Sequence, residues 1–239
     1  MDLIVDIGNS SAKVAVFNND TLVMRRRLGN DLTDSLAMIV EDYRIKACAL
    51  SIVGKTQPEV EVALRHLVPH TLHVTGHTPT PLICDYATPE TLGADRLAAA
   101  VGAATLMPGH DLLVIDAGTC ITYEFVNAEG HYLGGNISPG LGIRLRSLHE
   151  QTALLPLVNS DENRQKIGTD TASAIRAGVL RGMELEVEGY IRTFKQEKPD
   201  GRVFVTGGNS HRFTENKEVI HHHTLVETGL HAILTYNLN

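Results

Sequence analysis

The sequence predicts an α/β protein made of two similar domains, each with a mixed sheet of parallel and antiparallel strands. Twice, a short apolar strand leads into Asp-x-Gly and then into a second strand, once at Asp6 and once at Asp116. The two copies are 110 residues apart, which is about the size of one domain. Strand-like and helix-like segments alternate in both halves of the chain. We therefore expect one domain over residues 1–110 and a second over residues 111–239, with a cleft between them.

The composition narrows the class of protein. The chain has 239 residues, of which 43% are hydrophobic and 21% charged, as in soluble globular proteins. Its net charge of −7 and its lack of a basic run argue against a nucleic-acid partner. No apolar run is long enough to span a bilayer and no signal peptide is recognisable, so we expect no membrane partner and a cytoplasmic location. The three cysteines are far apart and are expected to be reduced.

The first Asp-x-Gly motif predicts a phosphate-binding turn between strands at 3–5 and 14–17. A glycine lets the backbone approach a ligand, and the polar side chains around it offer hydrogen-bond donors. A carboxylate at the end of a buried strand normally faces a cation, so Asp6 is a candidate magnesium ligand, acting through water. The same turn without a ligand remains an alternative. The candidate nucleotide-binding residues are Asp6, Ile7, Gly8, Asn9, Ser10, Ser11, Ala12 and Lys13.

The second copy favours the functional interpretation. An apolar strand over 112–115 leads into Asp116-Ala117-Gly118-Thr119, and a second strand follows over 123–126. Two facing hairpins, each with an aspartate and polar turn residues, would grip a nucleotide phosphate tail from both sides.

The rest of the first half completes a sheet with helices. Hydrophobic spacing predicts strands over 21–28, 46–53 and 72–74, and helices over 32–43 and 58–67. We interpret the run Arg25–Arg27 as a solvated strand end rather than as a phosphate patch.

A loop from residue 85 runs into a helix of small side chains that continues to residue 104. An acidic residue in a first turn favours the helix dipole, which accounts for Asp95. It does not account for the neighbouring Arg96 or for Gly93, which weakens the helix start. We therefore interpret the Asp95–Arg96 pair as functional.

The second half repeats this plan with variations. We expect a Gly-rich bend over 133–140 that continues into a helix to about 148, and a long helix over 171–190 capped by Thr169, Asp170 or Thr171. A buried strand over 202–206 ends in Gly-Gly at a predicted helix start. Close backbone approach there suits a nucleotide base or ribose.

The chain ends with a predicted helix over 226–238, which could pack on its own domain or fold back onto the first. Before it, the run His221–His223 could suggest a metal site. Neighbouring strand residues point to opposite faces, so the three side chains cannot share one ion. We expect an exposed edge or turn.

These motifs resemble the phosphate 1, phosphate 2 and adenosine motifs of the acetate and sugar kinase, heat-shock chaperone and actin superfamily. Within it, the chain closely resembles the type III pantothenate kinases over nearly its whole length. The resemblance implies the actin-like ATPase (ribonuclease H-like) fold. The matching segments are 6–13, Gly93-Ala94-Asp95-Arg96, 116–122, 134–140, Thr171 with Ala174 and Gly178, and Thr206-Gly207-Gly208.

The resemblance implies ATP-dependent phosphorylation of pantothenate, the first step of coenzyme A synthesis, by a homodimer. It implies Asp95 as the base for the hydroxyl proton, and Asp116 as the ligand of a monovalent cation, K⁺ or NH₄⁺. Magnesium would accompany ATP, which residues 6–13, Thr119 and the segment Thr206-Gly207-Gly208 would hold. The residues implied around pantothenate are Tyr86, Gly93, Ala94, Asp95, Arg96 and Thr171. We further expect Arg96 to lower the pKa of the Asp95 carboxylate and to keep it ionised.

Two other functions are compatible with the fold. A catalytically silent regulatory or accessory relative would keep the glycines that the fold needs but could lose Asp6, Lys13 or Asp95, and all three are present. Another small-molecule kinase or a phosphatase of the superfamily would share both hairpins without requiring Gly-Ala-Asp-Arg.

Overall fold

A computed structural model describes residues 1–8, 11–29, 31–54, 57–159, 165–213 and 219–238. The chain folds into two compact units. The first unit comprises Met1–His110, Glu124–Gly134 and Thr224–Asn239, and the second comprises Asp111–Tyr123 and Gly135–His223. The expected domain division at residue 110 and the cleft remain predictions.

The first sheet is mixed and has the strand order β3-β2-β1-β4-β5. β1, β2 and β3 are joined as antiparallel neighbours, whereas β4 runs parallel to β1 and β5 parallel to β4. Its elements, in chain order, are β1 (Asp2–Ile7), β2 (Ala12–Asn18), β3 (Thr21–Leu28), α1 (Leu32–Asp42), β4 (Ala47–Ile52), α2 (Pro58–Leu67) and β5 (His70–His73).

The second sheet has the strand order β11-β10-β7-β8-β9-β6. The boundary between the compact units passes through β8 and β9. The remaining elements are β6 (Ile83–Cys84), η1 (Pro89–Thr91), α3 (Ala94–Leu106), β7 (Leu112–Ala117), β8 (Cys120–Val126), β9 (His131–Pro139), α4 (Leu141–Glu150), α5 (Thr171–Glu197), β10 (Arg202–Thr206), η2 (Ser210–Phe213), β11 (Val219–His221) and α6 (Leu225–Leu238).

The two sheets repeat one topology, with β7 to β11 corresponding to β1 to β5. In the first sheet Asp6 lies opposite Ser51 of the parallel neighbour β4. In the second sheet Asp116 lies opposite Thr206 of the parallel neighbour β10. Each motif aspartate is therefore the last but one residue of a central strand and lies beside a hydroxyl-bearing residue. The predicted α/β class with two similar mixed sheets is confirmed.

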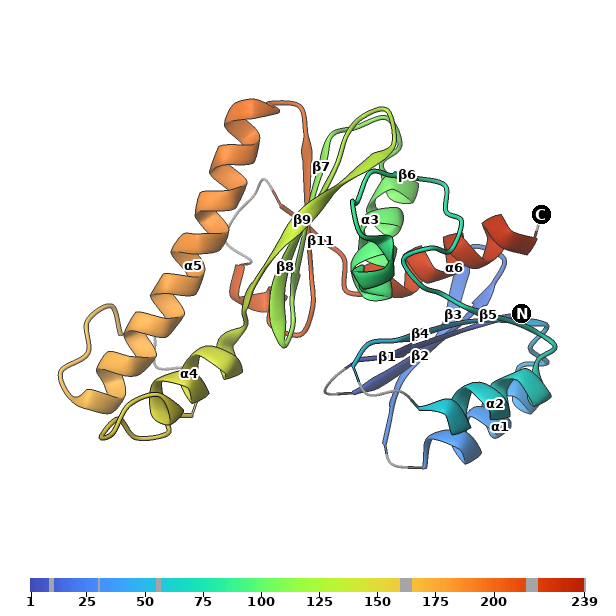
Figure 1. Cartoon of the computed structure of the whole chain (residues 1–239), viewed down its shortest axis with the longest axis horizontal. Coiled ribbons are helices and arrows are strands. Elements are labelled where there is room, and N and C mark those ends of the chain that lie inside the picture. The colour runs from blue at the N-terminus through green and yellow to red at the C-terminus, as the bar shows by residue number, and fades with distance from the viewer. Residues whose placement is uncertain (9–10, 30, 55–56, 160–164, 214–218, 239) are drawn as a thin grey trace. The chain divides into compact units, whose positions relative to one another are not determined.

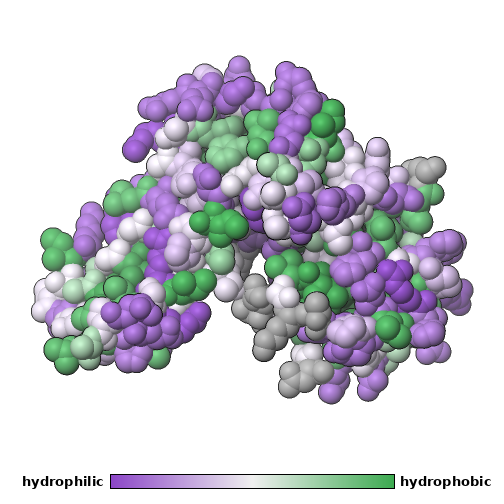
Figure 2. Space-filling view, in the orientation of Figure 1, coloured by the Kyte–Doolittle hydropathy of each residue, from purple (hydrophilic) through white to green (hydrophobic). Residues whose placement is uncertain are grey.

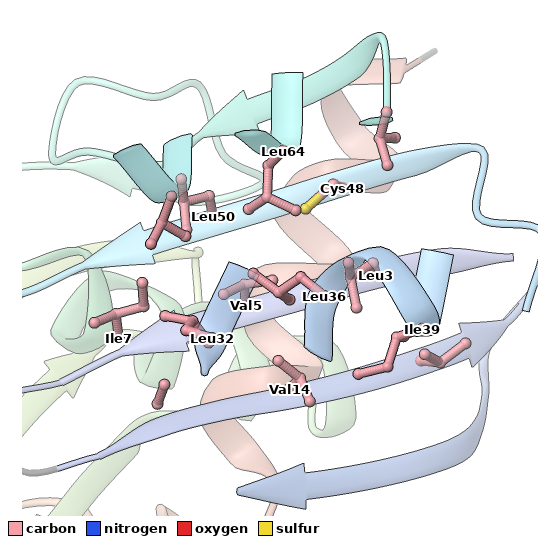
Figure 3. Packing of buried hydrophobic residues seen from close by; sticks show 14 residues of the cluster. Leu3, Val5, Ile7, Val14, Leu32, Leu36, Ile39, Cys48, Leu50 and Leu64 are labelled. Atoms are coloured by element: carbon pink, nitrogen blue, oxygen red, sulfur yellow. The ribbon is translucent and has the colours of Figure 1, made fainter. Parts of the chain in front are cut away.

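One face of the first sheet packs on α1 and α2 around a hydrophobic cluster (Figure 3). Alternate residues of the strands point into it, as the period of a strand requires, and leucine and isoleucine side chains of the helices meet them. The labelled members are Leu3, Val5, Ile7, Val14, Leu32, Leu36, Ile39, Cys48, Leu50 and Leu64. The opposite face, which carries Asp6, packs on the other helical layer.

That layer consists of α3 and α6, which lie side by side in the first unit (Figure 1). α6 contacts β1, β2 and β4, so the last helix packs on the first sheet. The two helices approach closely at glycines. A Cβ atom at Gly229 would lie 1.8 Å from the carbonyl oxygen of Ala98, and one at Gly102 would lie 2.3 Å from that of Leu225.

We expect Gly229→Ala to destabilise the protein, because the new methyl group would force α3 and α6 apart. Overpacking of this kind typically costs about 1–3 kcal/mol. The control is Gly189→Ala in α5, where an added Cβ atom would have no described heavy atom within 4 Å apart from its chain neighbours and the nearby backbone of its own helix. The control should gain about 0.5–1 kcal/mol from helix propensity alone. Urea unfolding of both variants measures the two effects, and equal stability would contradict the close packing.

In the second unit α5 is amphipathic, with buried side chains at helical spacing from Ile175 to Phe194. Its N-cap is Asp170, in a capping box with Ser173. Thr171 therefore follows the cap and is exposed. Hydrophobic patches lie over the α4–α5 side of this unit (Figure 2).

Three expectations for the second half need correction. Residues 133–139 continue strand β9 rather than forming a bend, because pairing within the sheet overrides the local preference of the glycines. The helix that begins after the Gly-Gly segment is a short 3₁₀ helix, η2. The histidine run agrees with expectation in part. His221 ends the edge strand β11 and His223 is exposed. However, the side chains of His221 and His222 are half-buried rather than exposed.

Among the described residues, no helix is long and apolar enough to span a membrane.

Candidate functional site

The first Asp-x-Gly motif builds a buried carboxylate with two partners. Asp6 is 5% exposed at the end of β1. Its Oδ2 lies 3.5 Å from Lys13 Nζ, which β2 brings back opposite Asp6, and Ser51 donates a hydrogen bond to Oδ1 at 3.3 Å. The turn closes through a hydrogen bond from the Gly8 N–H to the Ser11 carbonyl at 3.1 Å. The pairing of β1 with β2 thus returns the lysine across the hairpin to the aspartate.

The other residues of this motif differ in what they can offer a ligand. Ile7 and Ala12 are buried, so only their backbones could contact a nucleotide. Asn9 and Ser10 lie outside the described residues.

Burial raises the pKa of Asp6 from 3.8 to about 6. The Lys13 ammonium opposes this shift, whereas the negative charges of Asp95 and Glu227 add to it. Asp95 is thus close enough to interact with Asp6 within the first unit. A carboxylate held in this way suits a site that gains a cation when a phosphate ligand binds.

Asp95 lies in the first turn of α3, as predicted, with Gly93 at the N-cap. Its Oδ1 accepts a hydrogen bond from the Arg96 backbone N–H at 2.8 Å. The pKa of Asp95 is raised, because burial outweighs that hydrogen bond and the charge of Glu124 adds to the rise. Arg96 does lower this pKa, as expected, through its backbone N–H and its charge, but burial has the larger effect and the net shift is upward.

The guanidinium of Arg96 instead binds a buried carboxylate. Nε and Nη2 of Arg96 donate to the two carboxylate oxygens of Glu124 in β8, both at 2.8 Å. Nη1 donates to the Tyr86 hydroxyl at 3.4 Å, and the guanidinium carbon lies 5.5 Å from the centre of the Tyr86 ring. Gly134, with φ +110°, lies beside that ring, since a Cβ atom there would be 3.4 Å from Tyr86 Cδ2. The structure thus brings Tyr86 together with the predicted segment 93–96.

In the second unit the ends of β7 and β10 form a glycine-lined turn. A Cβ atom at Gly207 would lie 2.4 Å from Asp116 Oδ1, and the φ of Gly207 is +91°. Only glycine fits this position. Thr206 is 3% exposed beside Asp116 in the sheet. The second motif therefore lies against the Thr-Gly-Gly segment.

Two further segments meet this turn. The Gly140 N–H, just before α4, donates to the Thr119 carbonyl at 3.1 Å. The Asn209 N–H donates to the Ala117 carbonyl at 2.9 Å. Asn209 also lines a pocket of about 350 Å³ beside α4. The other lining residues are Leu141, Gly142, Leu145, Arg146, Leu157, Val158 and Asn159.

Sequence reasoning missed Glu124, Ser51 and Asn209. Glu124 had a usable signal, because a carboxylate inside the apolar strand 120–126 needs a buried partner. Ser51 had none, since its neighbour is set by the sheet register. Among the described residues, no three His, Cys, Asp or Glu side chains gather as a metal site.

Solved structures of other proteins share the fold. A Baf family transcriptional activator from Campylobacter jejuni matches with a TM-score of 0.65 and 20% identity, covering 99% of both chains. The ROK hexokinase of Thermus thermophilus matches with a TM-score of 0.54 and 13% identity, again over 99% of both chains. These likenesses agree with the predicted actin-like fold class.

Sequence comparison is more specific. The family model described as type III pantothenate kinase matches residues 2–193. The type III pantothenate kinase of Bacteroides fragilis is 47% identical, covering 99% of this chain and 98% of the relative. Those of Phocaeicola vulgatus and Porphyromonas gingivalis are 44% and 41% identical, each covering 99% of both chains. The chain therefore belongs to the type III pantothenate kinase family.

Proposed function

We propose that this chain is a phosphotransferase that transfers the γ-phosphoryl group of ATP to the primary hydroxyl of pantothenate, the first step of coenzyme A synthesis. Its family membership supports the activity. The observation that carries the mechanism is the half-buried carboxylate of Asp95, which lies in the first turn of α3 and has a raised pKa. Such a carboxylate is a better proton acceptor than an ordinary aspartate.

In the proposed reaction, Asp95 orients the acceptor hydroxyl and accepts its proton as the oxygen attacks the γ-phosphorus. The bond from that phosphorus to the β–γ bridging oxygen breaks, and ADP leaves. Tyr86, Gly93, Ala94, Arg96 and Thr171 would surround pantothenate. The transition state is loose and needs positioning and charge neutralisation more than covalent help. The Lys13 ammonium, beside Asp6, would neutralise charge on the phosphates.

Residues of both motifs would hold ATP. The backbone of 6–13 and Thr119 would contact the phosphates, and the segment Thr206–Gly208 would contact the nucleoside. The pocket of about 350 Å³ that Asn209 helps to line supports this assignment. Its volume and its mixture of polar and apolar lining residues suit part of a small-molecule ligand.

Magnesium fits at Asp6, because this ion commonly binds through one carboxylate, substrate phosphates and retained waters. The ion would supply charge neutralisation at the phosphates. A monovalent cation fits at Asp116, where carboxylate and neighbouring backbone oxygens provide hard oxygen ligands.

We expect activity to depend strongly on K⁺ or NH₄⁺ and expect Asp116→Asn to weaken that dependence, because the amide removes the formal charge at the cation site. Initial rates in KCl, NH₄Cl and NaCl at constant magnesium and ionic strength measure the effect. Equal rates of the wild-type enzyme in all three salts would contradict the assignment of Asp116.

We also propose that the protein forms a homodimer. The exposed apolar side chains of the second unit support an interface there, notably Leu154, which is 92% exposed, and Ile167, which is 80% exposed. Sedimentation at several concentrations tests this assembly.

A coupled ATP assay tests the function. Pantothenate, acetate, hexoses and N-acetylglucosamine are offered separately, and ADP release is followed. We expect turnover above the ATPase background with pantothenate only. Turnover with a sugar or with acetate would assign a different kinase, and no turnover with any acceptor would favour the silent relative.

A further inference from the structure

A fully buried carboxylate, Glu124, holds the arginine that follows the proposed base. Glu124 is 0% exposed and Arg96 is 7% exposed. Both carboxylate oxygens accept from Arg96 at 2.8 Å, in the bidentate geometry that makes such pairs strong and directional. Burying both charges is costly, and an apolar pair of similar volume is often as stable. The stability of the fold alone therefore does not account for this pair.

The pair is fixed from two further sides. The Tyr132 hydroxyl donates to Glu124 Oε2 at 2.6 Å, and Tyr132 is 0% exposed. Nη1 of Arg96 reaches the Tyr86 hydroxyl. The Nε–Nη2 edge of the guanidinium is thus occupied by Glu124, and the side that remains faces Tyr86. A substrate carboxylate could therefore reach this guanidinium in a bidentate manner only through its Nη1–Nη2 edge, on the Tyr86 side.

Arg96 in turn holds the proposed base. Its backbone N–H donates to Asp95 Oδ1 at 2.8 Å. The N-cap Gly93 has no side chain that could share this role. A shift of Arg96 would therefore move the hydrogen bond that sets the Asp95 carboxylate.

We propose that Glu124 is a positioning residue for phosphoryl transfer, which anchors Arg96 so that the start of α3 presents Asp95 to the acceptor hydroxyl. This inference rests on the proposed function. It assigns to the Arg96 guanidinium an anchoring role, with contact to pantothenate limited to its Tyr86 side.

The charge of Glu124 also acts on the base. Burial raises the pKa of Asp95, the Arg96 N–H and guanidinium lower it, and Glu124 raises it. Asp6 is a further carboxylate that interacts with Asp95. Removing the charge of Glu124 should therefore lower the pKa of Asp95 and move the acidic limb of the kcat profile to lower pH.

The test variant is Glu124→Gln, which keeps the shape of the side chain. We expect kcat to fall on the order of 10-fold to 100-fold, as for small misplacement of a reacting group, with the KM for ATP unchanged. The acidic limb should move to lower pH. Tyr132→Phe should lower kcat less and leave the limb in place, because the charge of Glu124 remains.

The matched control is Glu186→Gln in the second unit. Glu186 is also bound by an arginine and a tyrosine, Arg144 and Tyr123. We expect this variant to lose thermal stability while its kcat stays within about twofold of wild type and its pH limb stays in place.

A double variant, Glu124→Leu with Arg96→Met, separates positioning from folding. An apolar pair should restore Tm toward the wild-type value, but kcat should stay low. Wild-type kcat and an unmoved pH limb in Glu124→Gln or in the double variant would overturn the positioning role. Absence of pantothenate-dependent turnover in the wild-type enzyme would instead refute the proposed function.

Discussion

Asp95→Asn is expected to lower kcat on the order of 10²-fold to 10⁴-fold, the usual contribution of a positioned general base. The amide can still accept the hydrogen bond from the Arg96 N–H, so the start of α3 should keep its geometry. Because the variant carries no partly desolvated negative charge at this position, its Tm should not fall. Steady-state kinetics beside thermal unfolding measures both effects.

The same substitution should leave ATP binding intact. The proposed phosphate contacts belong to residues 6–13 and Thr119, so the Kd of an unreactive ATP analogue should be unchanged. A variant that folds normally and turns over at the wild-type rate would remove Asp95 from the mechanism. A large loss of nucleotide affinity would assign it to binding instead.

Asp6→Asn is expected to raise the stability of the ligand-free protein at pH 8 while lowering kcat on the order of 10²-fold to 10³-fold. Burial raises the pKa of Asp6 to about 6 in the folded state, from 3.8. A group whose pKa is raised by folding stabilises the folded protein fully at pH values below its pKa in the unfolded state. This stabilisation is lost as the pH rises through the folded-state pKa of about 6. At pH 8 the ionised carboxylate therefore costs up to about 3 kcal/mol, at about 1.4 kcal/mol per pKa unit, and the amide avoids that cost.

The sign of this stability change can be checked by measuring the Tm of the wild type and of Asp6→Asn at two pH values, without magnesium or nucleotide. The variant should be more stable than the wild type at pH 8. The difference should shrink to about a third at pH 4.5, where Asp6 is mostly protonated in the folded state but still mostly ionised in the unfolded state. A lower Tm for Asp6→Asn at pH 8 would mean that the pairing with Lys13 outweighs the cost of burial. In that case Asp6 would be a structural ion-pair partner and not a carboxylate held ready for a cation.

The sequence was sufficient for features that depend on local chemistry. The two Asp-x-Gly copies predicted a repeated sheet topology, because strand, turn and strand are encoded within a dozen residues. Thr206 and Gly207 were recognisable as a segment whose backbone can be approached closely, because a glycine directly after a buried strand typically serves that role. The same holds for the helix start at Asp95, where the structure agrees with the expected position.

Features set by distant contacts were not predictable. The partner of Arg96 is Glu124, 28 residues away on a strand, and no spacing rule connects a helix start with a strand interior. The direction of the Asp95 pKa shift depends on burial by the folded chain. Residues 133–139 have the composition of a bend, but their neighbours in the sheet hold them as a strand.

The most direct test of the central claim is identification of the product. Wild-type enzyme, ATP, magnesium, potassium and pantothenate are incubated and analysed by mass spectrometry, beside the Asp95→Asn variant. We predict stoichiometric ADP and 4′-phosphopantothenate from the wild type, and almost none from the variant over the same time. ADP with inorganic phosphate but no phosphorylated pantothenate would contradict the proposed function.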